Sequence, residues 1–349
     1  MISLDDEQAL RAGDPSGLLE AFLSMPGQLL PAYRSGAAAI VGGDQPASIA
    51  FCGMGGSGAA GDAVAALLRD VVAIPMSMVR GPTLPGHCGK DALVICLSYS
   101  GGTEETLSCY REARKRGCLV AVVAADGPLA EAAERDGAIL ARVRGDVSMP
   151  RAALGSLVGG LLGLIEAAGI DEPDGEHVRE AADVLRSLAG ELGPARPTGS
   201  NEAKALAAWV GDRTPVIWGS EGLAEPAALR WKAAFNENAK VPAFASALPE
   251  LTHHEVVGWS EERGGTYALL VLRHDGEHPT MARQLPATLD VVGGSGLEAR
   301  QVFARGRSKL ARLLSLELMA DAASTYHALM RGVDPTPIEA IARIKDRLR

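Results

Sequence analysis

The chain has 349 residues, a length that favours two domains of ordinary size. Its composition, 47% hydrophobic and 22% charged, predicts packed globular domains and argues against general disorder. The formal net charge of −9 disfavours non-specific binding to nucleic acid or to anionic membranes, because both need basic faces. A cytoplasmic protein that acts on small molecules fits these numbers better.

Three further features exclude other classes of protein. The five cysteines include no C-x-x-C pair, so they predict neither a disulfide framework nor a zinc site. The opening letters MISLDDEQAL carry acids where a secretion signal needs basic and apolar residues. The most apolar run, residues 152–165, is shorter than the roughly 20 residues of a membrane span. We expect this run to be a buried helix, whose small residues pack closely within a core or at a subunit interface.

The first half of the chain alternates between strand and helix patterns after a helical N-terminal segment. Apolar runs predict strands and amphipathic runs predict helices. The predicted strands are residues 47–53, 71–79, 91–100 and 118–125, and the predicted helices are 56–70, 105–117 and most of 151–192. Such alternation implies a parallel sheet that is covered by helices on both faces.

The second half repeats this logic with different letters. Residues 193–200, GPARPTGS, have the composition of a linker. The predicted elements after it are helices at 201–212, 223–240 and 308–332, strands at 214–220, 267–273 and 287–293, and a short terminal helix. We therefore predict two α/β domains, residues 1–192 and 193–349.

The stretch IAFCGMGGSGAAGD, residues 49–62, raises the possibility of a dinucleotide site. Gly53, Gly55 and Gly58 satisfy the G-x-G-x-x-G spacing of dinucleotide-binding folds. Such folds place an acid at the end of the next strand, but this strand ends in SMVRGP with Arg80. A dehydrogenase is therefore disfavoured, and we expect no nicotinamide cofactor.

A second glycine-rich turn, SYSGGTEETL, favours a smaller anion. Ser98, Ser100 and Thr103 follow an apolar strand and precede a helix, where hydroxyls, backbone N–H groups and the helix dipole attract a compact dianion. The alternative is an ordinary polar helix start, with Glu104 and Glu105 complementing the dipole. Because two such turns are spaced as the ends of adjacent strands would be, we predict a phosphate monoester site at the carboxyl edge of the parallel sheet. Its residues are Ser57, Ser98, Ser100, Thr103, Gly55 and Gly56.

The two turns resemble those of the sugar isomerase (SIS) domain, and other segments resemble the bifunctional phosphoglucose/phosphomannose isomerases, a tandem-SIS family. The segments that carry the resemblance are CGMGGSGAAGD, SYSGGTEETL, MPRAALG, FNENAKVPAF, LPELTHHEVVGW and RGVDPTPIEAIARIK. The resemblance implies two tandem SIS domains, each a mostly parallel, flavodoxin-like sheet in a three-layer α/β/α arrangement. It also implies a homodimer, a sugar phosphate substrate, and neither metal nor cofactor.

By resemblance, four residues carry the conversion of an aldose phosphate into a ketose phosphate. Glu237 is the base that moves a proton between C1 and C2, and Arg151 lies near the enediolate oxygens. His253 assists ring opening, in its own or the partner subunit, and Lys345 corresponds to the family's C-terminal ring-opening lysine. Without the family, each would pass for an ordinary surface charge. His274 and His278 lie in a loop pattern with glycine and proline, which disfavours a metal site.

The sequence departs from the family pattern at two positions. Gly102 stands where asparagine is usual in the second turn, which should loosen the turn and remove an amide donor. His254 stands where asparagine usually follows the histidine, and two adjacent positive rings would disfavour each other's protonation. These departures keep open a non-catalytic sugar phosphate sensor. A DNA-binding regulator lacks support, because neither a helix-turn-helix segment nor a basic face is evident.

Overall fold

The computed structural model describes residues 2–39, 45–170, 173–259 and 264–347. The chain divides into two compact units. The first-sheet unit consists of Ser24–Arg186 and Arg305–Leu314. The second-sheet unit consists of Met1–Leu23, Ser187–Ala304 and Ser315–Arg349. Each unit therefore draws on separate stretches of the chain, whereas the predicted ranges 1–192 and 193–349 divide it at one point.

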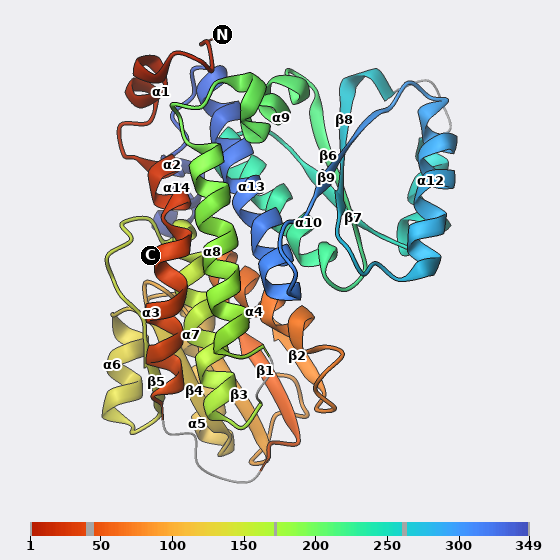
Figure 1. Ribbon diagram of the computed structural model, residues 1–349. Coiled ribbons are helices and arrows are strands. Elements are labelled where there is room, and N and C mark those ends of the chain that lie inside the picture. Colours follow the sequence, from red (N-terminus) through yellow and green to blue (C-terminus); the bar gives the residue numbers. More distant parts are fainter. Residues whose placement is uncertain (1, 40–44, 171–172, 260–263, 348–349) are drawn as a thin grey trace. The chain divides into compact units, whose positions relative to one another are not determined.

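The first-sheet unit is built on a five-stranded sheet of parallel pairs (Figure 1). The strand order is β2 (Met76–Val79), β1 (Ser48–Cys52), β3 (Ala92–Leu97), β4 (Leu119–Ala124) and β5 (Ile139–Arg142). This is the flavodoxin-like order 2-1-3-4-5. Every residue of β1 and β3 is buried, as expected for central strands covered on both faces.

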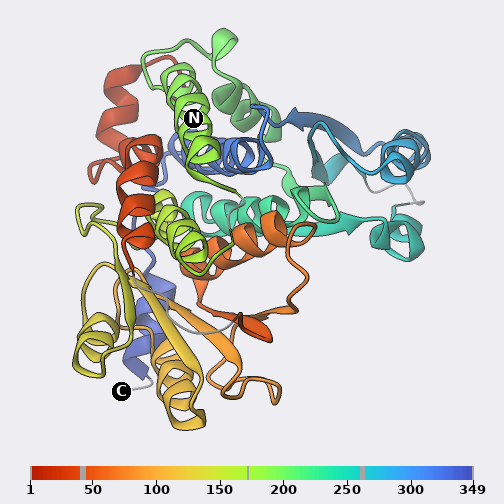
Figure 2. The same cartoon turned by 60° about the horizontal axis from the view of Figure 1, so that its bottom comes forward.

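Helices lie on both faces of this sheet (Figure 2). They are α3 (Met25–Ala37), α4 (Gly55–Leu68), α5 (Glu104–Arg116), α6 (Pro128–Arg135) and α7 (Leu154–Ala167). The start of α8 (Gly175–Leu192) also belongs to this unit. One face is covered by α5 and α6, whose buried residues pack in one core with alternate residues of β1, β3 and β4. The other face is contacted by α4 and α7. The predicted three-layer α/β/α arrangement is confirmed for this unit.

The apolar helix predicted at 152–165 is confirmed as the buried helix α7, and its main partner is α3. Glycines bring the two backbones together. A Cβ atom on Gly163 would lie 2.0 Å from the carbonyl oxygen of Tyr33, and one on Gly36 would lie 2.2 Å from that of Gly160. The small residues of this run therefore serve close packing inside one unit.

The second-sheet unit is built on four strands in parallel pairs (Figure 1). Their order is β7 (Phe244–Leu248), β6 (Thr214–Ser220), β8 (Tyr267–Arg273) and β9 (Glu298–Phe303). The helices are α1 (Glu7–Gly13), α2 (Leu18–Leu23), the end of α8, α9 (Glu202–Val210), α10 (Ala224–Ala234), α11 (Glu255–Gly258), α12 (Pro279–Gly293), most of α13 (Lys309–Met330) and α14 (Glu339–Arg347). Counted within this unit the order is 2-1-3-4, which matches the first four strands of the first sheet.

The strand predicted at 287–293 is wrong, because these residues form the end of α12. Leu285, Thr288 and Val292 are the buried residues of this helix, at the spacing of one helical face. The strand that completes the sheet is β9, at 298–303. Its first four residues are exposed, so it lacks the apolar run by which buried strands are recognised.

The linker-like segment 193–200 is held firmly within the second-sheet unit. The buried Lys204 donates from Nζ to the carbonyl oxygens of Pro194 and Arg196, both at 2.7 Å. Asn201 Nδ2 donates to the carbonyl oxygen of Gly193 at 3.2 Å. The composition is that of a linker, and these bonds fix the backbone of the segment within this unit.

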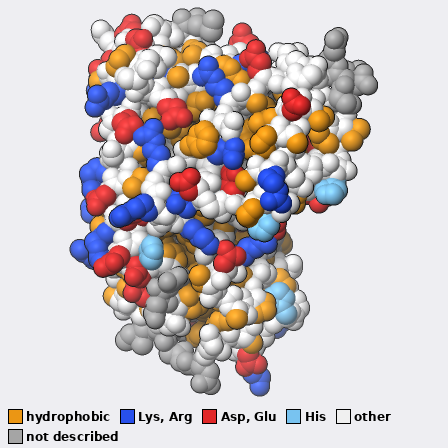
Figure 3. Space-filling model, turned by 45° about the vertical axis from the view of Figure 1, so that its right-hand side comes forward, with side chains coloured by type: hydrophobic (Ala, Val, Ile, Leu, Met, Phe, Trp, Pro, Cys, Tyr) orange, Lys and Arg blue, Asp and Glu red, His pale blue; other side chains and the backbone are white. Residues whose placement is uncertain are grey.

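The surface and the cysteines fit a packed protein. All five cysteines are free and buried. In the described part of the chain, no helix combines the length and hydropathy that a membrane crossing needs. Figure 3 shows basic and acidic side chains interspersed over the visible face.

Candidate active site

The two turns predicted to bind phosphate lie beside each other at the carboxyl edge of the first sheet. They follow β1 and β3, which are neighbours and pair Cys52 with Cys96. The backbone N–H of Tyr99 in the second turn donates to Ser57 Oγ in the first turn at 3.4 Å. The prediction that both turns meet at one edge is therefore supported by topology and by a contact.

The hydroxyls of the second turn are organised around Ser98, which is buried. Ser98 Oγ and Thr103 Oγ1 are 3.1 Å apart, and the N–H of Gly102 donates to Ser100 Oγ at 3.5 Å. Thr103 occupies the N-cap of α5, but its side chain makes no capping hydrogen bond there. An ordinary polar helix start would use this hydroxyl as a cap. The arrangement leaves the capping role at the start of α5 to another acceptor, such as a bound anion.

Backbone conformation at both turns depends on glycine. Gly55 begins α4 with φ +54°, and the N-cap residue Met54 has no side-chain capping bond. Gly101 has φ +67°, and a Cβ there would lie 2.0 Å from the carbonyl oxygen of Asp126. Both helices therefore begin directly at the sheet edge, where their dipoles favour negative charge.

Arg151 lies next to the first turn, within the same unit. It belongs to a short 3-10 helix, Pro150–Ala152, that contacts α4. A Cβ on Gly56 would be 3.5 Å from Arg151 Cα, so the backbones of the two segments are in contact distance. The structure thus brings together seven of the predicted residues: Gly55, Gly56, Ser57, Ser98, Ser100, Thr103 and Arg151.

Glu237 lies in the second-sheet unit, in a five-residue π-helix, Phe235–Ala239, that continues α10. Its neighbours anchor this wide turn. Asn238 Nδ2 donates to Ser324 Oγ at 3.0 Å, and Asn236 Oδ1 accepts from the N–H of Ala243 at 2.9 Å. Glu237 itself is half-buried. A π-helix of one turn is frequently found at functional sites, and here it carries the proposed base.

A pocket of about 440 Å³ adjoins Glu237. Asn236, Glu237 and Lys240 line one side, and residues 337–341, leading into α14, line the other. Lys345 is exposed on α14, one turn beyond Ile341 on the same helix face, and is not part of the lining. The structure therefore brings the start of the C-terminal helix to Glu237, with Lys345 further along it.

His253 is exposed at the end of a 3-10 helix, Glu250–His253, beyond the carboxyl end of β7. It does not line the Glu237 pocket. His254 is one of the two departures from the family pattern. Its Nε2 lies 3.5 Å from Glu250 Oε1, so this imidazole has a carboxylate beside it as well as His253 next to it in the chain.

The other histidine pair makes separate local contacts. His274 Nε2 is 3.4 Å from Ser220 Oγ, and His278 caps α12 by accepting from the N–H of Thr280 at 3.2 Å. Across the residues that the structure describes, no group of three or more His, Cys, Asp or Glu side chains could hold a metal ion.

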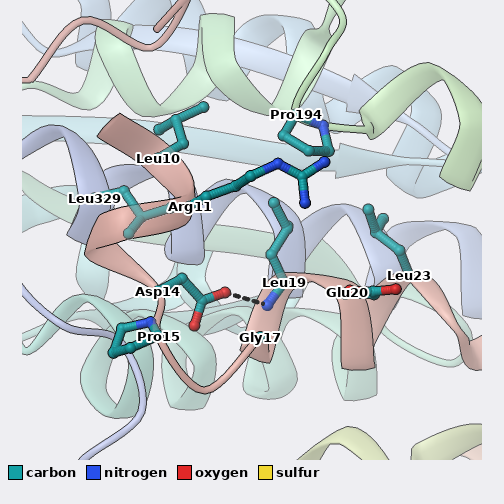
Figure 4. A pocket seen from close by; sticks show the side chains of 10 residues that line it. All are labelled: Leu10, Arg11, Asp14, Pro15, Gly17, Leu19, Glu20, Leu23, Pro194 and Leu329. Atoms are coloured by element: carbon teal, nitrogen blue, oxygen red, sulfur yellow. Dashed lines mark hydrogen bonds between the residues drawn. The ribbon is translucent and has the colours of Figure 1, made fainter. Parts of the chain in front are cut away.

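A second pocket, of about 450 Å³, lies among α1, α2 and the end of α13 (Figure 4). Its walls are mainly leucine and proline side chains. Asp14 in this pocket accepts from the N–H groups of Leu18 and Leu19 at 2.9 and 2.8 Å, and Arg11 pairs with Glu7 at 2.7 Å. None of the predicted site residues lines it.

Comparison with known proteins agrees with this geometry. The SIS domain family matches residues 44–144, and the bacterial phospho-glucose isomerase C-terminal SIS domain matches residues 199–348. A bifunctional phosphoglucose/phosphomannose isomerase from Caldicellulosiruptor bescii is 32% identical over 95% of this chain and 98% of its own. The chain belongs to the bifunctional phosphoglucose/phosphomannose isomerase family. A second relative of that name, from Aquifex aeolicus, is 34% identical over 86% of this chain and 90% of its own.

The fold of this isomerase-family chain is also found among solved structures. A glucose-6-phosphate isomerase like protein from Thermus thermophilus matches with a TM-score of 0.63 and 21% identity, over 96% of this chain and 98% of that one. This likeness supports the predicted fold class of two SIS domains.

Sequence reasoning missed the residues that support Glu237. Lys240 is the one non-glycine residue with positive φ in the described chain, at +57°. Residues 337–341 form the opposite wall of the pocket. The only sequence signal for this arrangement was the prolines at 335 and 337 before an amphipathic terminal segment, and a pattern of that kind does not say which element it meets.

Proposed function

We propose that this chain interconverts glucose 6-phosphate and mannose 6-phosphate with fructose 6-phosphate. The observation that carries the substrate class is the pair of neighbouring turns at the carboxyl edge of the first sheet, joined by the contact of Tyr99 with Ser57. Family membership supports the reaction, and it favours an enzyme over a non-catalytic sensor.

In this proposal the phosphate is held without metal or lysine. The N-termini of α4 and α5 contribute backbone N–H groups and positive dipole ends. Ser57, Ser98, Ser100 and Thr103 contribute hydroxyl groups. Preorganised donors of this kind bind a dianion well, because they do not need to reorient when it arrives.

Glu237 then moves one proton. As a carboxylate it takes the proton from C2 of the open-chain aldose, while the C1 carbonyl oxygen gains a proton and the C2 hydroxyl loses one. The cis-enediolate collapses when Glu237 returns its proton to C1, which gives the ketose. In the reverse direction, rotation about C2–C3 before reprotonation at C2 allows either aldose epimer to form.

The remaining roles are assigned by chemistry and family resemblance. Arg151, beside the first turn, stabilises negative charge on the enediolate oxygens. His253 and Lys345 assist ring opening. We propose a cytoplasmic homodimer in which His253 acts in its own or the partner's site.

A coupled assay with fructose 6-phosphate tests the proposal. Glucose 6-phosphate and mannose 6-phosphate are measured separately in the presence of a chelator. Formation of either product supports the isomerase. Absence of both products, with fructose 6-phosphate binding intact by calorimetry, would overturn it in favour of the sensor.

A further inference from the structure

Two cations hold the end of the π-helix that carries Glu237. Lys240 Nζ donates to the backbone carbonyl oxygen of Glu237, and also to that of Pro335 at 2.8 Å. Arg331 Nη1 donates to the carbonyl oxygen of Ala239 at 3.2 Å. Carbonyls at the end of a helix lack intrahelical donors, and here side chains from two directions satisfy them.

The Lys240 ammonium joins two segments that lie far apart in the sequence. One is the π-helix with Glu237. The other begins at Pro335 and continues into residues 337–341, which form the opposite wall of the Glu237 pocket and the start of α14. The Lys240 side chain therefore bridges the two segments that form opposite walls of this pocket.

The backbone at Lys240 supports a specific role. Its φ of +57° lies in the left-handed region, which is unfavourable for a residue with a Cβ. Glycine or asparagine would occupy this C-terminal position with less strain. A lysine here supplies an ammonium group that neither of those residues has.

We infer that Lys240 is a positioning residue of the isomerase, which holds the Glu237 carboxylate at a set distance from the C-terminal segment. The inference rests on the proposed role of Glu237. Proton transfer depends steeply on geometry, and a displacement of about 1 Å can cost roughly 100-fold in rate. Lys240 acts through the backbone of Glu237 and needs no contact with substrate.

The test compares four variants in the full chain. Lys240→Met removes the ammonium and keeps the side-chain length, Lys240→Arg keeps donors, Lys240→Gly removes the ammonium and relieves the backbone, and Lys232→Met changes an exposed lysine of α10 as a control. We expect Lys240→Met and Lys240→Gly to lose roughly 10- to 100-fold in kcat, with KM for fructose 6-phosphate changed by less than about 3-fold. Lys240→Arg should recover most of the loss.

The second readout is the ratio of the initial rates at which glucose 6-phosphate and mannose 6-phosphate form from fructose 6-phosphate. Destabilisation of the fold alone would not change this ratio. A displaced carboxylate reprotonates the two faces of C2 in a changed proportion, whereas partial unfolding lowers both products equally. An unchanged ratio with lowered activity, or wild-type kcat in Lys240→Gly, would overturn the inference.

Hydrogen–deuterium exchange separates this inference from the proposed function. In Lys240→Met, but not in Lys232→Met, exchange should rise several-fold in peptides covering 235–240 and 333–341. Unchanged exchange would refute the coupling even if the enzyme is active. Increased exchange in a protein without isomerase activity would support the coupling and refute only the reaction.

Discussion

The two sheets begin with the same strand order, yet their first strand-to-helix turns are suited to different chemistry. After β1 the chain passes through Gly53 and Met54 into α4, whose first turn contains Gly55, Gly56 and Ser57. After β6 it passes through Glu221 and enters α10, which has Glu225 in its first turn. Carboxylates at a helix N-terminus occupy the place that a bound anion would take. The comparison teaches that one topology can hold the proposed anion site in one unit and carry the proposed base, Glu237, just beyond the corresponding helix in the other.

The interiors differ as well. The core beneath α5 and α6 contains all five cysteines among small apolar residues. In the second-sheet unit, Arg230 on α10 and Asp321 on α13 form a buried ion pair at 2.6 Å, with side chains 4% and 0% exposed. Arg230 lies on the helix that leads to Glu237, and Asp321 lies on α13.

Removing the proposed base should have the largest effect on catalysis while leaving substrate binding, assigned to the other unit, nearly unchanged. We expect Glu237→Gln to lose on the order of 1,000-fold in kcat, because the amide cannot accept the C2 proton. Binding of fructose 6-phosphate by calorimetry should stay within about 3-fold of wild type, since the proposed phosphate donors are elsewhere. Wild-type turnover in this variant would remove the assignment of the base.

The buried ion pair should be the most sensitive point of the second-sheet unit. Asp321→Ala leaves the charge of Arg230 without its carboxylate and should lower the free energy of unfolding by about 3–5 kcal/mol. Urea denaturation of the full chain measures this loss. The double variant Arg230→Met, Asp321→Met is the control, because an apolar pair of similar volume should recover much of the stability. Equal losses in both would argue against the electrostatic explanation.

Giving the turn after β1 the acidic character of the turn after β6 should weaken substrate binding. Ser57→Glu places a carboxylate where the phosphate is proposed to bind, and like-charge contact costs several kcal/mol. We expect KM for fructose 6-phosphate to rise by roughly 100-fold, while Ser57→Ala raises it by less than about 10-fold. If Ser57→Glu binds as well as Ser57→Ala, the phosphate does not contact this turn.

The smallest expected change is a tighter binding of substrate at the second glycine-rich turn, SYSGGTEETL. A Cβ on Gly102 would find only the carbonyl oxygen of Ser100, at 4.0 Å, so the turn has room for a side chain. Gly102→Asn should lower KM about 2- to 5-fold, since it reduces the freedom of the unbound turn and restores an amide donor. A raised KM would show that the glycine suits this turn better than the family's usual asparagine.

The sequence predicted the elements whose burial is continuous. β1 and β3 were recognisable from apolar runs, and the glycine-rich turns that follow them, which are proposed to bind phosphate, were found with them. β9 was missed because Arg300 and its neighbours are exposed on an edge strand. The strand predicted at 287–293 failed because β-branched letters outweighed the helical spacing of Leu285 and Val292.

Apart from the meeting of the two glycine-rich turns at one sheet edge, the long-range contacts described above were not predicted. The pairing of Lys240 with Pro335 joins residues separated by 95 positions, and no local pattern encodes it. The assignment of residues 1–23 and 305–314 to their compact units has the same character. Family resemblance named Glu237, while only the structure showed what holds it.

The glycine contact between α3 and α7 has a consequence for engineering. Gly159 takes part in this contact together with Gly36 and Gly163, since a Cβ there would lie 2.4 Å from the carbonyl oxygen of Leu29. The two helices pack closely because glycines leave no side chains between their backbones. Recombination among relatives should therefore exchange them as one block, although more than a hundred residues separate them in the gene. Chimeras that inherit one helix from each parent would combine helix surfaces that are not complementary. We expect most such chimeras in a recombination library to fail to fold.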